Sequence, residues 1–183
     1  MSVSARELVG YEALWGRGVF YPRPGAGYLL IEGPDRLDFI QRQTTNDARL
    51  VGPGRAVLTV LTSPAARILD VFTVLQDGES LVLLTQLGGG GPAAEYLRSR
   101  LFFMDRVLIT DVSARYVQFD LGGAAAARAL TGLGLAPIPE LGGVVDGGIA
   151  GLPVKVVGQE GLFGPGYRLI GRAEDSSALT AAL

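Results

Sequence analysis

The fold of this chain is decided first by residues 31–47, which read IEGPDRLDFIQRQTTND. The stretch begins at the end of an apolar run, Tyr28 to Glu32, which predicts a strand. Gly33-Pro34 predicts a turn, and Asp35 then stands where a side chain caps a following helix. The helix should end near Gln43, because the Thr, Asn and Asp side chains after it bond their own backbone and favour turns. A strand, a turn, a helix and a polar loop are therefore expected in this order.

Three β-rich runs follow this stretch, with turn signals at Ser63-Pro64 and Asp77-Gly78 between them. They are Arg55 to Thr62, Arg67 to Gln76 and Ser80 to Gln86. Such runs predict an antiparallel meander. Within the second run, Arg67 and Asp70 stand at odd spacing and should face opposite sides of the strand. One of them could enter a pocket while the other caps an edge, but pairing at the surface is favoured.

A glycine run, Gly88 to Gly91, separates the meander from a helix expected over Pro92 to Phe103. Backbone N–H groups ahead of a helix could hold an anion. The run lacks the Lys and Ser/Thr of a phosphate-binding loop, so a plain flexible connection is favoured.

The remaining sequence predicts a second group of strands and helices. Strands are expected at Arg106–Asp111, Arg115–Leu121, Val144–Ile149, Pro153–Val157 and Tyr167–Gly171, and helices at Ala124–Leu130 and Glu174–Leu183. Together these elements predict an α+β fold of antiparallel sheets with packed helices. We expect two subdomains, residues 1–112 and a split β-α-β-like unit over residues 113–183. Because the chain stops within the last helix, the second subdomain is expected to be incomplete, and a homo- or hetero-oligomer could complete it.

Composition excludes several functions. The 183 residues include no Cys and no His, which excludes thiolate nucleophiles, Cys-ligated clusters and Ser-His-Asp catalysis. No metal site is expected. The net charge of −2, without a basic block, argues against a nucleic-acid partner. No apolar run approaches the roughly 20 residues of a membrane span, and Met1 to Gly10 lacks a signal-peptide core, so we expect a cytoplasmic protein without a membrane partner.

Residues 31–47 resemble the GxDRxxFLQxxxTND stretch of the glycine-cleavage T-protein, or aminomethyltransferase, superfamily. The resemblance continues through Leu50, Pro53-Gly54 and the segment from Thr62 to Asp70, and it covers roughly residues 17 to 121. The segment from Ser99 to Val107 is closer to the YgfZ-type branch, whose members are folate-binding proteins linked to iron–sulfur protein maintenance. The resemblance implies a folate-binding fold in a truncated form, without the family's third domain.

The family's functional residues transfer only in part. The family's catalytic Asp, which follows an Asn-Ala pair on a strand, is matched by Ala93, and Gln86-Leu87 match the pair. No catalytic residue is therefore assigned. The family's pterin-contacting Glu is matched by Arg168, which reverses the charge and cannot accept a hydrogen bond. The cysteine motif of the YgfZ-type branch is absent.

The first hypothesis is a non-catalytic accessory protein that binds tetrahydrofolate or a derivative between the meander and the Pro92 helix. Leu84, Gln86, Tyr96 and Arg168 are the candidate ligand-binding residues. The second hypothesis is an interaction subunit without a ligand, completed by another chain. The third is a working one-carbon transferase, for which few proton-transfer groups are present.

Overall fold

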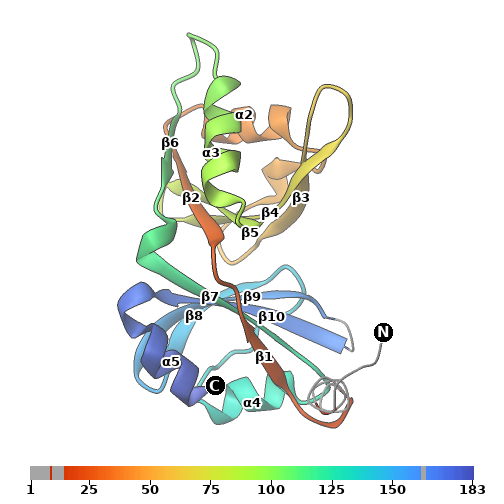
Figure 1. Cartoon of the computed structure of the whole chain (residues 1–183), viewed down its shortest axis with the longest axis vertical. Helices are drawn as coiled ribbons and strands as arrows, with labels where there is room; N and C mark the ends of the chain where they lie inside the picture. Colours follow the sequence, from red (N-terminus) through yellow and green to blue (C-terminus); the bar gives the residue numbers. More distant parts are fainter. Residues whose placement is uncertain (1–8, 10–14, 162–163) are drawn as a thin grey trace. The chain divides into compact units, whose positions relative to one another are not determined.

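The computed structural model describes Val9, residues 15–161 and residues 164–183. The chain forms two compact units. One spans Pro24–Tyr116 and is called the inserted unit here, because the chain enters the other unit first and returns to it afterwards. The other, the terminal unit, combines strand β1 (Val19–Pro22) with the residues from Val117 onward (Figure 1).

The inserted unit is built on a five-stranded antiparallel sheet in the order β3-β4-β5-β2-β6. Its strands are β2 (Ala26–Glu32), β3 (Val57–Thr62), β4 (Ile68–Asp77), β5 (Ser80–Leu87) and β6 (Leu108–Asp111). The α-helices are α2 (Arg36–Gln43) and α3 (Gly90–Ser99), and short 3-10 turns lie at Ala48–Leu50 and Ser113–Arg115. The expected meander is confirmed, with the β4–β5 hairpin closing at Asp77↔Ser80.

The core of the inserted unit lies between its two α-helices and one face of the sheet. Alternate strand residues point to this face, as the period of two in a strand requires. Leu29, Ile31, Phe72, Val74 and Leu83 from the sheet share one buried cluster with Phe39, Ile40 and Leu97 from the helices. Full burial of such side chains contributes roughly 1.5–3 kcal/mol each.

The terminal unit contains a five-stranded sheet in the order β1-β7-β10-β9-β8. Its further strands are β7 (Tyr116–Gly122), β8 (Val144–Ile149), β9 (Leu152–Gly161) and β10 (Gly164–Arg172). Helices α4 (Ala126–Gly132) and α5 (Ser176–Ala182) pack against it, the latter after a 3-10 turn at Ala173–Asp175. Phe119, Leu130, Val156, Leu169 and Leu179 form the centre of its core. The α+β class expected from the sequence is confirmed for both units.

The division of the chain differs from the expected 1–112 and 113–183. Strand β1 pairs with β7, with Val19 opposite Gly122 and Phe20 opposite Leu121. The start of the described chain therefore belongs with its second half. The change back to the terminal unit falls between Tyr116 and Val117.

Two expectations about helix ends are wrong. The helix expected to reach Phe103 ends at Ser99. Beyond it, the backbone N–H of Phe102 donates to the carboxylate of Asp105 at 3.0 Å, which holds the chain in a turn. Asp35 occupies the N-cap position of α2 but makes no side-chain cap bond. Its carboxylate instead receives three hydrogen bonds from Arg106.

Candidate ligand-binding pocket

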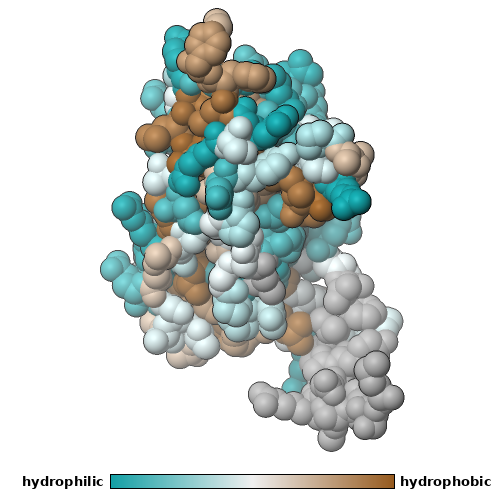
Figure 2. Space-filling view, turned by 45° about the horizontal axis from the view of Figure 1, so that its top comes forward, coloured by the Kyte–Doolittle hydropathy of each residue, from teal (hydrophilic) through white to brown (hydrophobic). Residues whose placement is uncertain are grey.

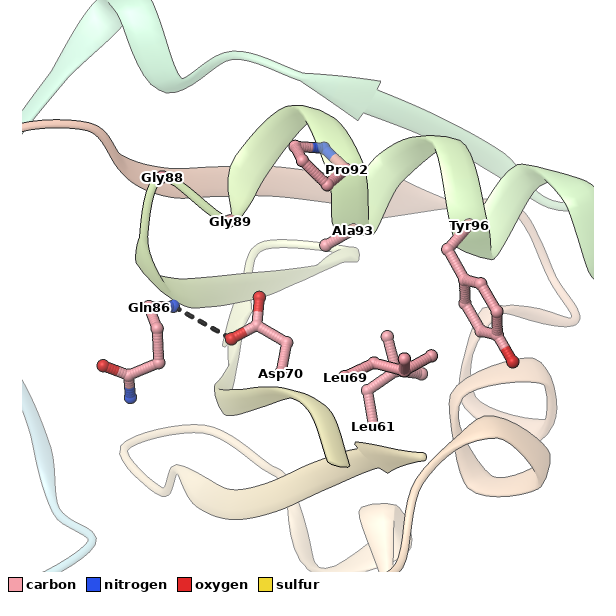
Figure 3. A pocket seen from close by; sticks show the side chains of 9 residues that line it. All are labelled: Leu61, Leu69, Asp70, Gln86, Gly88, Gly89, Pro92, Ala93 and Tyr96. Atoms are coloured by element: carbon pink, nitrogen blue, oxygen red, sulfur yellow. Dashed lines mark hydrogen bonds between the residues drawn. The ribbon is translucent and has the colours of Figure 1, made fainter. Parts of the chain in front are cut away.

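A pocket of about 410 Å³ opens in the inserted unit beside the start of α3 (Figure 3). Its lining residues are Leu61, Leu69, Asp70, Gln86, Gly88, Gly89, Pro92, Ala93 and Tyr96. The β4–β5 pairing runs from Asp77↔Ser80 only to Thr73↔Leu84, and the pocket lies beyond that last pair. Small-molecule sites usually measure about 300–1,000 Å³ and combine apolar walls with a few polar groups. This pocket fits that description.

Asp70 contributes a carboxylate to the pocket wall, and the residue is only 8% exposed. Its Oδ1 accepts hydrogen bonds from the backbone N–H of Val71 at 2.7 Å and of Gln86 at 3.2 Å. The carboxylate thereby joins β4 to the end of β5. Pairing at the surface, the role expected for Asp70, is wrong. The sequence did carry a signal, because Asp70 is in phase with the buried residues Phe72 and Val74.

The glycine run is more than a flexible connection. A Cβ on Gly89 would lie 2.5 Å from Oδ2 of Asp70, and one on Gly90 would lie 3.0 Å from Cα of Gly27. The N–H of Gly88 donates to the carbonyl of Gly25 at 2.7 Å. These glycines let the backbone pass close to β2 and to a carboxylate. A carboxylate at this place also argues against the anion cradle considered above.

Two of the predicted ligand-binding residues line the pocket. Gln86 and Tyr96 lie at its opposite ends, with Asp70 between them (Figure 3). Gln86 is exposed, whereas Tyr96 is half-buried. The Tyr96 hydroxyl lies 3.5 Å from the carbonyl of Thr62. Ala93, at the position of the family's catalytic Asp, is 5% exposed and contributes only a methyl group to the wall.

The other two predicted residues do not lie in this pocket. Leu84 is fully buried in β5 and is not among the lining residues. Arg168 lies on β10 of the terminal unit, where its Nε donates to Asp120 at 2.9 Å. Arg23 and Gln159 donate to the same carboxylate, at 2.5 and 3.0 Å. Arg168 is thus part of a partly buried ion cluster around Asp120. Ligand binding by Arg168 stays a prediction.

The terminal unit has a second pocket of about 530 Å³, beside Tyr167. Burial raises the pKa of the Tyr167 phenol above its usual 10.0. The charged residues of this lining are Glu140 and Glu160. Two carboxylates in its lining make this pocket a poor site for an anionic ligand.

The Thr44-Thr45-Asn46 part of the quoted stretch covers the outer edge of β3. The N–H of Thr45 donates to the carbonyl of Val60 at 3.1 Å, and the Asn46 side chain donates to Leu58 at 2.6 Å. An uncovered edge strand can pair with other chains. These polar residues therefore cover the edge of the sheet, and their hydrogen bonds to β3 account for them without a bound ligand.

The Gly33-Pro34-Asp35 turn fixes the loop that follows α3. A Cβ on Gly33 would lie 2.0 Å from the carbonyl oxygen of Arg106, and Gly33 has a φ of +102°. The hydrogen bonds from the Arg106 side chain hold the pKa of Asp35 at about 2, below its usual 3.8. A second ion pair, Arg42 to Asp105 at 2.7 Å, holds the same loop. The Gly33-Pro34-Asp35 turn therefore has a structural role, which is to hold the loop after α3 in place.

Neither a metal site nor a membrane helix emerges from the described residues. Over Val9, 15–161 and 164–183, no group of three or more His, Cys, Asp or Glu side chains could hold a metal ion. Within the same residues, no helix has the length and apolar character needed to cross a bilayer.

Comparisons with known proteins point to one family. The GCVT N-terminal domain family matches residues 25–140. The aminomethyltransferase of Geobacillus kaustophilus is 28% identical over 180 residues, which cover 94% of this chain and 48% of that protein. The aminomethyltransferase of Listeria monocytogenes is 25% identical over 161 residues and is covered to 44%. The chain thus spans about half the length of the curated relatives it matches.

Two solved structures share the fold. The glycine cleavage system aminomethyltransferase T of Bartonella henselae matches 96% of this chain with a TM-score of 0.82 and 18% identity, and 47% of that chain is covered. A chain of the heterotetrameric sarcosine oxidase from Corynebacterium sp. U-96 matches 87% of this chain with a TM-score of 0.59 and 17% identity. Of that second chain, 78% is covered.

Proposed function

Because this chain belongs to the GCVT N-terminal domain family, we propose that it is a non-catalytic accessory protein that binds a tetrahydrofolate-type ligand in the pocket beside α3. The observation that carries the proposal is the pocket itself, whose lining residues, from Leu61 to Tyr96, all fall within the matched residues. A planar ligand would rest between the apolar side chains of Leu61, Leu69 and Pro92, with Tyr96 closing one end.

Absence of aminomethyl transfer is proposed because Ala93 stands where the family has its acid. A methyl group can neither accept a proton nor orient a reacting nitrogen. The described pocket residues offer no thiol or imidazole, and the Oδ1 of the one carboxylate among them, that of Asp70, already accepts hydrogen bonds from the backbone N–H groups of Val71 and Gln86. The pocket would bind and hold its ligand without transforming it.

We place the chain in the YgfZ-type branch and assign it a role in maintaining iron–sulfur proteins in the cytoplasm. The support for this branch is the segment from Ser99 to Val107, with its Phe102-Phe103-Met104 tip. Figure 2 shows apolar side chains at this end of the inserted unit, and Phe103 is 97% exposed.

The first experiment is a calorimetric and thermal-shift titration with tetrahydrofolate and 5-formyl-tetrahydrofolate. Ligand at about 100 times its dissociation constant should stabilise the fold by roughly 2.7 kcal/mol. Tyr96→Ala should weaken binding, whereas Tyr21→Ala, which removes an exposed tyrosine of the terminal unit, should not. The absence of both binding heat and thermal shift at millimolar ligand would contradict the proposal. Aminomethyl transfer by the wild-type chain would contradict it as well.

The second candidate function is an interaction subunit of a larger assembly. The observation that favours it is the sarcosine oxidase chain, which belongs to a heterotetramer and is covered to 78%. Under this proposal the tagged chain should co-purify with one partner in a fixed ratio from its native cells. A strictly monomeric chain that binds folate would favour the first function instead.

A further inference from the structure

The loop between α3 and β6 ends in a tight turn that carries three large apolar side chains. It projects beyond the end of α3 (Figure 1). The backbone N–H of Asp105 donates to the carbonyl of Phe102 at 3.0 Å, so Phe103 and Met104 occupy the two central positions of a β-turn. Small or polar residues are usual at those positions. Phe103 is 97% exposed, and Phe102 and Met104 are exposed as well. These three residues are called the apolar tip here.

Hydrogen bonds and ion pairs hold this turn in one conformation. The carboxylate of Asp105 accepts from the backbone N–H of Phe102 at 3.0 Å and from Arg42 of α2 at 2.7 Å. The next residue, Arg106, is bound to Asp35 by the three hydrogen bonds described above. A shape that is fixed before binding loses less conformational entropy in a complex. The apolar tip is therefore preorganised for contact with another surface.

The charged groups beside the apolar tip present their cations to the solvent. The side chains of Arg42 and Asp105 are 43% and 11% exposed. Those of Arg106 and Asp35 are 71% and 27% exposed. Arg100, which precedes the apolar tip, is exposed too. A surface that docks here meets guanidinium groups, which bind carboxylates through two parallel hydrogen bonds.

We propose that the apolar tip is a docking element, and that it inserts Phe103 into an apolar pocket of a partner protein whose rim carries Asp or Glu side chains. Aromatic anchors that fill a pocket commonly contribute much of the binding energy of a complex. The tip residues are not among the lining residues of the pocket beside α3. The inference therefore goes beyond the proposed function, because it assigns a different surface and the chemistry of its partner.

Size and charge favour such a pocket over a second copy of the chain or a membrane. At roughly 150–250 Å² for a large side chain, three residues fall short of the about 800 Å² per partner of a stable interface. Two tips facing each other would also oppose arginine to arginine. Anionic membranes attract clusters of about 4–8 basic residues. Arg42 and Arg106 are already paired with carboxylates, so they act on a partner at contact rather than at a distance.

The test places the photoreactive amino acid p-benzoylphenylalanine at position 103 of the full chain in its native cells. A control chain carries it in place of Tyr21, an exposed tyrosine of the terminal unit. We expect position 103 to give one cross-linked protein that position 21 does not give. The cross-linked peptide should map to an apolar pocket with Asp or Glu at its rim.

The purified partner is then titrated with variants of the chain. Phe103→Ser should weaken binding at least about tenfold, whereas Tyr21→Ser should not. Arg100→Glu should weaken binding several-fold, with a smaller loss at high salt. Arg55→Glu makes the same change of charge at an exposed position before β3 and should have no such effect. Because all four positions are at the surface, the urea midpoints should match that of the wild type.

Several results would overturn the inference. Among them are cross-linking at position 103 no stronger than at position 21, and partner binding that Phe103→Ser leaves unchanged. Arg100→Glu and Arg55→Glu with equal effects would overturn the acidic rim. Sedimentation of the wild type, but not of Phe103→Ser, with vesicles of phosphatidylcholine and phosphatidylglycerol would assign the apolar tip to a membrane instead. A wild-type dimer that Phe103→Ser dissociates would assign it to a second copy.

The same variant separates this inference from the proposed function. Phe103→Ser should lose the partner and keep any binding of tetrahydrofolate, because the apolar tip lies outside the lining of the pocket beside α3. A chain that binds no folate and still docks through Phe103 would overturn the proposed function alone.

Discussion

Gly89 and Gly91 stand two positions apart at the start of α3, yet their surroundings differ. A Cβ on Gly89 would meet Oδ2 of Asp70 at 2.5 Å and the carbonyl of Gln86 at 3.1 Å, whereas one on Gly91 would meet nothing within 4 Å. Gly89→Ala should therefore destabilise the fold by about 1–3 kcal/mol. Gly91→Ala should be neutral or stabilise it by up to about 1 kcal/mol. Urea unfolding of both variants gives the comparison, and equal midpoints would contradict it.

Ala93 offers a second prediction at the residue scale. Ala93→Asp restores the family's acid but places it in the same pocket as Asp70. Two carboxylates in one site raise the pKa of one of them. The folded-state pKa then exceeds the unfolded one, so the penalty is fully present above the raised pKa and is relieved as pH falls. We expect the variant to lose about 1–3 kcal/mol at pH 8 and less at pH 5.

The control for this prediction is Ala93→Asn, which has nearly the same size and no charge. Urea midpoints of the two variants are measured at both pH values. A loss in Ala93→Asp that is independent of pH would show that size, not charge, causes it.

At the scale of elements, the ion pair between Asp35 and Arg106 ties the loop after α3 to the turn before α2. The pKa of Asp35 lies at about 2, against a usual 3.8. A lowered folded-state pKa contributes stability that is present above the unfolded value and is lost as pH falls through the folded value. The link should therefore persist at pH 4 and be lost as the pH falls toward 2.

The measurement is a carboxyl-detected NMR titration of the side chain of Asp35. Its midpoint should lie near the value of about 2 and should move up toward 3.8 in Arg106→Ala. Arg100→Ala, in the same loop, serves as the control and should leave the midpoint unchanged. An ordinary midpoint in the wild type would show that the ion pair does not form in solution.

Most elements could be predicted from local patterns, and the failures share a cause. The meander and α2 follow from alternation, turn residues and helix-favouring residues nearby in the sequence. The role of Asp35 was wrong because its partner, Arg106, is distant in sequence. Surface pairing was wrongly favoured over a pocket position for Asp70 because its burial depends on the start of α3, although its phase with Phe72 was visible. Gln86 and Tyr96 were placed at the pocket only through the family resemblance.

At the scale of the whole molecule, the pairing of β1 with β7 makes the inserted unit an insertion between two parts of the terminal unit. No local sequence pattern predicts such a pairing, because a strand of this length is too short for a clear alternation of apolar and polar residues, and its partner lies far along the chain. The sequence could therefore predict two subdomains but not that the chain visits the terminal unit twice.

This connectivity predicts which fragments fold. Residues 24–116 contain all five strands, both α-helices and the whole core cluster of the inserted unit. A compact unit with its own core can fold alone. We therefore expect residues 24–116 to unfold cooperatively in urea and to show dispersed amide signals. If the proposed function holds, the fragment should also bind tetrahydrofolate, because it contains every lining residue of the pocket beside α3.

The fragment of residues 117–183 is the contrasting case, because it lacks β1. Its sheet would expose the edge of β7 that β1 covers through the pairs Phe20↔Leu121 and Tyr21↔Asp120, and it would also lose the ion pair between Arg23 and Asp120. An open edge strand favours aggregation. We expect this fragment to be unstable, and to gain stability when residues 17–23 are joined to its start through a short Gly/Ser linker. The urea midpoints of the two forms decide the matter, since equal midpoints would mean that β1 adds nothing to the terminal unit.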